Sequence, residues 1–309
     1  MPVRFGYACI NMELSEQGII CSRTMRKATF EKKGISYASE LSLRNIQSIL
    51  PILKWNNDNG VKVFRISSEL MPWASEYNFE DLPDYEEICS SLEKIGRYAR
   101  MTGQRLSFHP GQFNCLASEK EHVILNCIKD LEIHGRIFDL MGMPQSPQSK
   151  INIHLGSTCG NNLQLAIDNF CRNFDRLTDS VKTRLTVEND DKPSMFSSKM
   201  LYEGVYKQIN VPIVFDSHHH GLGPQDAPYD EAFQMAVDSW PQGIRPVCHH
   251  SNSKKKYEDP TVNRHAAHSN FYYEPFIDNG HEVDVVLEAK QKERALFDYL
   301  QKWPQEEQQ

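Results

Sequence analysis

The amino-acid sequence predicts a single (β/α)8 barrel, also called a TIM barrel. Eight short runs rich in apolar, β-branched and aromatic residues recur along the 309 residues, and most are followed by a stretch with helical periodicity. Strands that alternate with helices of roughly 10 to 20 residues indicate βαβ units and a parallel sheet. Eight such units favour a sheet that closes into a barrel over an open sheet. The chain is long enough, since a typical barrel has about 250 residues.

The candidate strands are short and mostly end in polar residues. They span residues 4–10, 61–67, 105–110, 151–156, 184–189, 212–217, 245–250 and 282–289. Candidate helices with apolar residues at helical spacing occupy residues 41–60, 85–103, 121–142 and 161–181. Pro51 lies inside the first of these and predicts a break or kink, because proline lacks a backbone N–H donor. The seventh unit is the weakest, since residues 251–281 resemble a long loop with one short helix around 271–280.

One domain accounts for nearly the whole chain. No linker rich in Gly, Pro or Ser interrupts it, so we expect a single domain over residues 1–303. The polar stretch PQEEQQ, residues 304–309, is expected to be a disordered tail. The eight cysteines form no CxxC pair, and several fall on strands or apolar helix faces. This indicates buried free thiols in a reducing cytoplasm and does not support a thiolate zinc site.

The charge and hydropathy of the chain exclude several classes of protein. A net charge of −7 argues against a polycation that coats nucleic acid without specificity, although a local basic cleft remains compatible with it. No stretch approaches the roughly 18 to 20 apolar residues of a membrane span. The N-terminus lacks an export signal. We therefore expect no membrane association and a cytoplasmic location at the nucleoid in a prokaryote, with the compartment left open for a eukaryote.

Residues that can bind metal stand at the C-terminal ends of most candidate strands. In a closed parallel barrel these ends meet on one face, where the active sites of the fold lie. A single His or Glu there is more often a hydrogen-bonded or solvated residue than a ligand. A whole set is different, because so many carboxylates and imidazoles would be costly to bury together without cations. The set comprises Glu69, His109, His154, Glu188, Asp216, His249, His250 and Glu288.

A metal centre with oxygen and nitrogen ligands suits two reaction classes. Divalent ions activate water and stabilise charge on a phosphoryl group, so phosphodiester hydrolysis is the first class. Isomerisation of a sugar or sugar phosphate on the same kind of barrel is the second. A barrel that binds metal without catalysis is a third possibility. No Ser-His-Asp or Cys-His arrangement suggests a protein nucleophile.

Seven motifs, taken together and in order, resemble the UV damage endonucleases. They are GYACIN, FRISSELMPWAS, LSFHPGQF, IHLG, VENDD, FDSHHH and LEAK, and the resemblance runs from Tyr7 to about Lys292. It implies a TIM barrel with three divalent ions at the C-terminal face of the strands. Mn²⁺ is the metal usually associated with the family, and Zn²⁺, Co²⁺ and Mg²⁺ remain open.

The resemblance also implies an activity and a partner. Family members start an alternative excision repair of DNA by cutting the backbone immediately 5′ to cyclobutane pyrimidine dimers and 6-4 photoproducts. Abasic sites are a further candidate substrate, and the attacking group is a metal-activated water. The expected partner is damaged double-stranded DNA. We expect a monomer without an obligate protein partner.

By position, the resemblance assigns the bridging role between two ions to Glu188. One of these ions would also bind His109 and His154, and the other Asp216, His249 and Glu288, so these six form the catalytic set. The third ion would bind His219 and His268. Gln112 and Phe113 match a pair that wedges into the duplex at the lesion, and Tyr7 and Asn11 match residues that contact DNA.

Three positions depart from the expected family residues. Phe113 stands where we expect Tyr, so stacking is kept and a hydroxyl is lost. Val247 stands where some members have a lysine near the metals. Glu69 stands where some members have His, and it could be a metal-adjacent carboxylate or only balance charge.

The remaining polar and aromatic clusters each have two interpretations. Lys254, Lys255 and Lys256 form either a solvated charge run or a contact with DNA phosphates. Phe271, Tyr272 and Tyr273 suit packing of the predicted short helix better than base stacking. Within the histidine triplet, His220 is expected to hold a ligand in place. His218 is expected to point into packing or solvent.

Overall fold

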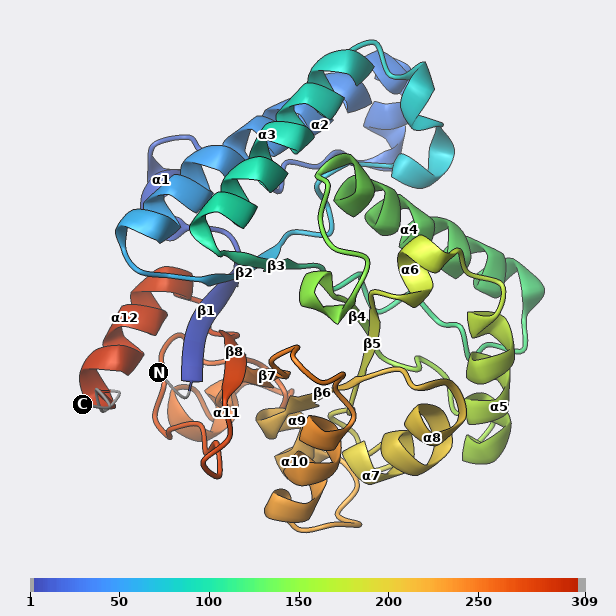
Figure 1. The fold of residues 1–309 in the computed structure, drawn as a ribbon, viewed down its shortest axis with the longest axis vertical. Helices are drawn as coiled ribbons and strands as arrows, with labels where there is room; N and C mark the ends of the chain where they lie inside the picture. The colour runs from blue at the N-terminus through green and yellow to red at the C-terminus, as the bar shows by residue number, and fades with distance from the viewer. Residues whose placement is uncertain (1–2, 305–309) are drawn as a thin grey trace.

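Eight parallel strands form a ring that is surrounded by helices, in a computed structural model that describes residues 3–304 (Figure 1). The strand order is β3-β2-β1-β8-β7-β6-β5-β4. A parallel bridge between Phe108 and Ile151 joins β3 to β4 and closes the ring. The predicted (β/α)8 barrel is confirmed. Its strands are β1 Val3–Cys9, β2 Val63–Ile66, β3 Arg105–Ser107, β4 Ile151–Ile153, β5 Leu185–Glu188, β6 Ile213–Asp216, β7 Val247–His250 and β8 Val283–Leu287.

The helices connect the strands around the outside of the ring, and α2 and α3 lie side by side along one edge (Figure 1). The α-helices are α1 Met12–Glu16, α2 Lys27–Asp58, α3 Tyr85–Thr102, α4 Glu121–Leu140, α5 Leu163–Phe174, α6 Asp179–Lys182, α7 Ser198–Leu201, α8 Lys207–Ile209, α9 Ser217–Leu222, α10 Tyr229–Asp238, α11 Lys254–Tyr257 and α12 Lys292–Lys302. Short 3-10 helices span Ala74–Glu76, Phe79–Asp81 and Pro147–Ser149, and a π-helical turn, Tyr202–Tyr206, joins α7 to α8.

Three local predictions were wrong. The helix around Pro51 is not broken there, because buried residues on both sides, among them Ile49 and Ile52, hold α2 against the barrel; the non-helical residue in α2 is Gly34. The segment predicted as one helix over 161–181 ends at Phe174 and continues as the separate turn α6. Residues 271–280 form no helix, and the short helix of this unit is α11.

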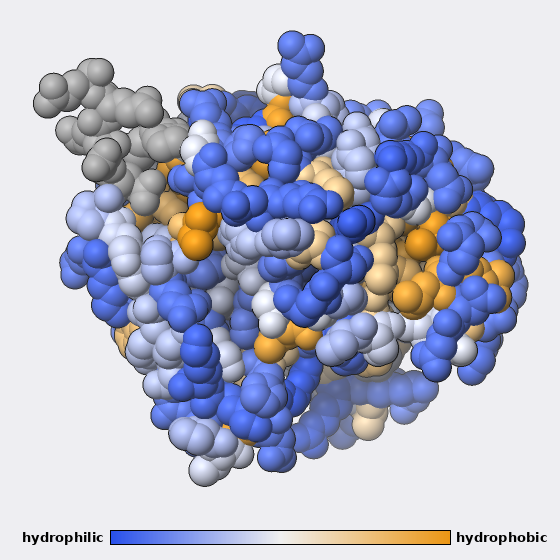
Figure 2. All heavy atoms as spheres, turned by 90° about the horizontal axis from the view of Figure 1, so that it is seen from below, coloured by the Kyte–Doolittle hydropathy of each residue, from blue (hydrophilic) through white to orange (hydrophobic). Residues whose placement is uncertain are grey.

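The polar tail predicted at residues 304–309 lies outside the described residues except for Pro304. All eight cysteines are free thiols, as predicted, and six of them are buried. No helix between residues 3 and 304 is long and apolar enough to cross a membrane. Figure 2 shows a face on which hydrophilic residues predominate and hydrophobic ones form small separate patches.

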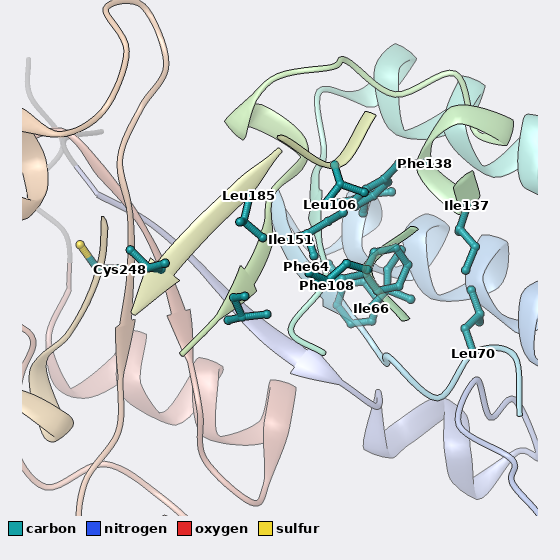
Figure 3. Close-up of a cluster of buried hydrophobic side chains, with 14 of the residues drawn as sticks. Phe64, Ile66, Leu70, Leu106, Phe108, Ile137, Phe138, Ile151, Leu185 and Cys248 are labelled. Atoms are coloured by element: carbon teal, nitrogen blue, oxygen red, sulfur yellow. The ribbon is translucent and has the colours of Figure 1, made fainter. Parts of the chain in front are cut away.

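Side chains alternate along each strand between the inside of the barrel and the surrounding helices. In β2, Phe64 and Ile66 point outward and pack in the core between strands and helices with Leu106, Phe108 and Phe138 (Figure 3). The rings of Phe108 and Phe138 lie 4.7 Å apart between centroids. The alternate residues of the same strands therefore point into the barrel, and these include the predicted ligands.

A buried charge cluster closes the N-terminal end of the barrel. Asp284 of β8 is fully buried and accepts two hydrogen bonds from Arg4, at 2.6 and 2.7 Å, and one from Arg105 at 2.9 Å. Arg105 also donates to the backbone carbonyls of Pro147 and Arg245. This end has no predicted metal ligand, which leaves the opposite end of the strands for chemistry.

Candidate metal centre

The predicted ligands converge at the C-terminal ends of the strands, on the inward-facing side. Each stands at the last inward position of its strand or within two residues beyond the strand end, so strand geometry alone directs it into the barrel mouth. The six residues of this set are His109, His154, Glu188, Asp216, His249 and Glu288. All lie in or directly after β3 to β8, as the sequence predicts.

Glu188 is the centre of the cluster and is almost completely buried. Its Oε2 atom lies 3.1 Å from Nε2 of His109 and 3.0 Å from Nδ1 of His249, and its Oε1 atom lies 3.3 Å from Nδ1 of His219. Asn152 of β4 donates a hydrogen bond to Oε2. One carboxylate is thus surrounded by three imidazoles.

Two groups of ligand atoms are close enough to hold an ion each. In both groups the potential ligand atoms lie within 4.8 Å of one another. The first group is His109, His154 and Glu188, and the second is Glu188, Asp216 and His249. Glu188 belongs to both groups, and its Oε2 atom faces a histidine of each.

Buried ligand atoms without hydrogen bonds show that the cluster fits divalent ions. Oδ2 of Asp216 and Nδ1 of His249 are buried and have no hydrogen-bond partner among the described residues. Nδ1 of His249 lies near Glu188, but the contact lacks hydrogen-bond geometry. Buried polar atoms are rarely left unpaired in folded proteins, and a cation coordinated by oxygen and nitrogen would satisfy both of these.

The carboxylates and imidazoles shift each other's pKa values strongly. Burial opposes the charged form of Glu188, yet the surrounding His249 and His154 outweigh it and hold the pKa of Glu188 well below its usual range. Burial lowers the pKa of His109 to about 4. Burial also opposes protonation of His154, but Glu188 and Asp190 outweigh it and raise the pKa of His154 to about 9.

His219 and His268 each keep one ring nitrogen free to bind an ion. Nδ1 of His219 lies 3.0 Å from the carbonyl oxygen of Asn189, and Nδ1 of His268 lies 2.5 Å from that of Glu288. A carbonyl can only accept, so each Nδ1 donates, and Nε2 is the ligand atom once the ring is neutral. Burial opposes protonation of His219, but Asp216 and Glu188 outweigh it and hold the pKa of His219 well above its usual range, so an ion bound there must displace a proton. Both residues line one cleft of about 380 Å³ together with His154.

His218 packs against the rings of both of these histidines and lines a different cleft from theirs. Its ring centroid is 6.4 Å from that of His219 and 6.2 Å from that of His268. Its Nε2 atom is buried and has no hydrogen-bond partner in the described part of the chain. His220 packs instead against Phe215 and Tyr229, and its imidazole makes no hydrogen bond to another described residue.

Four charged or polar residues of the site were missed in the sequence. Arg65 of β2 forms an ion pair with Glu288, and Nζ of Lys150 lies 3.2 Å from Nε2 of His249. Asn152 holds Glu188, and Oδ1 of Asp190 lies 3.2 Å from Nδ1 of His154. Burial lowers the pKa of Lys150 to about 7.

Strand alternation would have identified two of them. Lys150 and Asn152 stand four and two residues before His154, so they share its inward face. Val247 stands two residues before His249 and packs with other inward valines such as Val63 and Val286. A lysine ammonium thus reaches the site from residue 150 and not from residue 247.

The residues expected to contact DNA differ in their exposure. Phe113 is 85% exposed, and both Gln112 and Phe113 line the cleft beside His219. Tyr7 and Asn11 are completely buried, which places them out of reach of DNA in this conformation. Tyr7 points outward from β1 and donates a hydrogen bond of 2.6 Å to Asn56 of α2, while Asn11 donates to the Tyr7 hydroxyl and caps α1.

The remaining candidates lie around the mouth of the barrel. Glu69 is exposed and belongs to neither ligand group; it lines an adjoining depression with Ser75 and Asp130, which shares Phe113 with the cleft. The lysine run forms α11, where Lys254 and Lys255 are half-buried and Lys256 pairs with Glu274 at 3.0 Å. Tyr272 is buried against His250, as the packing interpretation predicted, although no helix forms there.

Comparison with known proteins identifies one family of relatives. A family model described as UV-endonuclease UvdE matches residues 3–308. A UV-damage endonuclease from Schizosaccharomyces pombe is 31% identical over 97% of the chain, which spans only half the length of that relative. A UV DNA damage endonuclease from Bacillus cereus (strain G9842) is 32% identical over 96% of the chain and 93% of its own length. The crystal structure of SacUVDE superposes with a TM-score of 0.84, at 27% identity and over 97% of both chains.

Proposed function

The chain belongs to the UV-endonuclease UvdE family, and from that premise we propose that it cuts the DNA backbone immediately 5′ to UV photoproducts. The proposed substrates are cyclobutane pyrimidine dimers and 6-4 photoproducts in duplex DNA, with abasic sites as a further candidate. One observation carries the proposal. The buried carboxylate of Glu188 lies among imidazoles, and one of them, His219, lines a cleft together with the exposed Phe113.

The described residues provide places for divalent ions, with Mn²⁺ as the proposed metal. Glu188 would bridge two of them, one held with His109 and His154 and one with the remaining three members of the set. His219 and His268 would hold a third. Bound ions of this kind lower the pKa of a coordinated water and stabilise negative charge on the phosphoryl group.

The residues of the chain itself perform the other steps. Arg65 neutralises Glu288, and Asn152 fixes the orientation of Glu188, so the two carboxylates are held in place before any substrate arrives. Phe113 would enter the duplex with Gln112 and take the place of the extruded lesion in the base stack. A photoproduct stacks poorly, so its extrusion costs less than that of a normal base pair, and this difference contributes to selectivity. We propose that a monomer acts alone on damaged double-stranded DNA.

A duplex with one pyrimidine dimer, labelled at the 5′ end of the damaged strand, tests the proposal. With Mn²⁺ we expect a single product that ends in a 3′-hydroxyl directly 5′ to the dimer, while an undamaged duplex stays intact. EDTA should prevent the cut. Glu188→Gln should abolish it while the circular dichroism spectrum and the elution volume stay unchanged, because the substitution alters one buried oxygen.

Two rival functions have distinct outcomes in this test. A metal-dependent sugar isomerase of the same barrel class would leave the dimer duplex uncut and would interconvert a ketose and an aldose. A barrel that only binds metal would retain Mn²⁺ through gel filtration and turn over neither substrate. Either result would contradict the proposed endonuclease function.

A further inference from the structure

Two cationic side chains line the cleft beside the candidate metal centre and have no partner among the residues that the structure describes. Lys192 and Arg264 are exposed and belong to the walls of the cleft that His154, His219 and His268 also form. Neither side chain has an ion pair or a hydrogen bond within residues 3–304. Every other arginine in that range except Arg26 has such a partner.

The loop that carries Arg264 is anchored to the barrel. Ser253 pairs with His268 in an antiparallel bridge, and its hydroxyl donates a hydrogen bond of 2.7 Å to the carbonyl of His265. The backbone N–H of Lys254 donates to the carbonyl of Ala267 at 2.7 Å. Arg264 therefore extends from a backbone that is tied to the end of β7, only four residues before His268.

The two cations approach the cleft from different sides. Lys192 lies in the loop after β5, and Arg264 lies in the loop after β7. The strand between them in the sheet is β6, whose end carries Asp216 and the helix with His219. A chain that crosses the cleft past His219 would meet one cation on each side.

The other charges of the cleft explain why cations are needed there. Asp190 and Asp191 line the same walls, and the whole protein carries a net charge of −7. A polyanion would be repelled from such a cleft unless local positive charge offsets the field. A guanidinium binds two phosphate oxygens at once, whereas an ammonium acts as a point charge.

We propose that Arg264 and Lys192 bind two backbone phosphates of the damaged DNA strand, on either side of the position that His219 faces. The inference rests on the proposed endonuclease function. It assigns the positioning of the strand to these two side chains and leaves the reaction at the cut phosphate to the metal ligands. Phosphate contacts of this type are independent of sequence and of damage.

Equilibrium binding of the full-length chain to labelled duplexes, with EDTA to prevent cutting, tests the inference. Arg264→Gln should weaken binding of damaged and undamaged duplex alike by about tenfold, and should lower the slope of log K against log salt by about one. Lys192→Gln should lower the slope in the same way with a smaller loss of affinity. Arg264→Lys should keep the slope and recover part of the affinity. The matched controls are Arg97→Gln and Lys94→Gln on the outer surface of α3, which should change neither quantity.

Neutral phosphates then locate the contacts. Each phosphate near the cut is replaced in turn by an uncharged methylphosphonate. At one phosphate, the one that Arg264 contacts, the replacement should weaken DNA binding by the wild-type protein. The same replacement should not weaken binding by Arg264→Gln any further, because this variant has already lost the contact. In nicking with Mn²⁺, Arg264→Gln should raise KM more than it lowers kcat.

The outcomes separate the two proposals. If wild type binds and cuts the dimer duplex and Arg264→Gln matches it in affinity and salt slope, the phosphate assignment is wrong and the endonuclease function stands. If wild type binds no duplex and cuts none, both proposals fall.

Discussion

The Nδ1 atom of His154 lies 3.2 Å from Oδ1 of Asp190, a residue that is itself 7% exposed. This contact, together with Glu188, raises the pKa of His154 to about 9 despite burial. A histidine that binds a metal must be neutral, so an ion that binds here must displace a proton. His109 has a pKa of about 4 and needs no such displacement.

Metal affinity should therefore rise with pH. Between pH 7 and about 9 we expect the affinity for Mn²⁺ to increase roughly tenfold per unit, with a plateau above about 9 where His154 is already neutral. Calorimetry at pH 7 in two buffers of different ionisation enthalpy should detect about one released proton per ion at this position. Asp190→Asn should reduce that release. A pH-independent affinity would contradict the assignment of His154 as a ligand.

Phe113 should contribute to DNA binding and not to stability. The ring is 85% exposed, so Phe113→Ala should change the free energy of unfolding by less than about 0.5 kcal/mol. Loss of base stacking should weaken binding to the dimer duplex by about 1–3 kcal/mol, and Phe113→Tyr should retain it. Fluorescence anisotropy and chemical denaturation measure the two quantities. Met101→Ala, an equally apolar change at a residue 77% exposed on α3, is the control and should alter neither.

Arg65 should stabilise the metal-free protein by neutralising Glu288. Burial opposes the charge on Glu288, but Arg65 and His249 outweigh it and hold the pKa of Glu288 well below its usual range. Arg65→Gln leaves that carboxylate without its main counter-ion and should lower the free energy of unfolding by about 3–5 kcal/mol. Added Mn²⁺ should restore part of the loss, because a bound cation neutralises the same carboxylate.

Thermal unfolding with and without Mn²⁺ measures the effect of Arg65→Gln. Arg97→Gln removes an exposed ion pair with Glu93 and should cost less than about 1 kcal/mol, with no dependence on metal. Equal losses with and without Mn²⁺ at Arg65 would show that the residue does not act through the metal-binding carboxylate.

Asp284 should matter for stability and not for the reaction. Asp284→Asn leaves Arg4 and Arg105 without their shared counter-ion at the N-terminal end of the barrel, which should cost about 3–5 kcal/mol. The rate of nicking per folded molecule should stay at the wild-type value, because the candidate metal centre lies at the opposite end of the strands. Denaturation curves and single-turnover rates measure the two effects. A lower rate at an unchanged unfolding midpoint would contradict this separation.

Strand-end residues such as Glu188 and His109 were predictable because two simple rules act along the chain. Helical and strand periodicities alternate eight times, and parallel strands bring their C-terminal ends to one face. Residues at the ends of different strands are therefore expected to lie close together in space, even when they are far apart in the sequence. Arg65, Lys150 and Asn152 stand inside or just before their strands, so attention to strand ends alone passes over them, although alternation places Lys150 and Asn152 on the same face as His154.

Other features depend on contacts that no local pattern records. The helix predicted at 271–280 does not form, because Tyr272 and Phe276 are buried and the backbone of Tyr273 donates to Asn252. Tyr7 belongs to a motif that resembles a DNA-contact site, yet its hydroxyl is bound to Asn56 of α2. His218 packs against the rings of two predicted ligands, His219 and His268, in a helix, α9, that begins directly at the end of β6.

By itself the sequence determined the barrel and the convergence of most candidate metal ligands at one face of it, since both depend on periodicity and on order along the chain. The tertiary structure alone decided which groups neutralise those ligands, and which aromatic and cationic side chains are free to meet DNA. Burial, pairing and pKa depend on distances between strands. Those distances arise only when the ring of strands closes between Phe108 and Ile151.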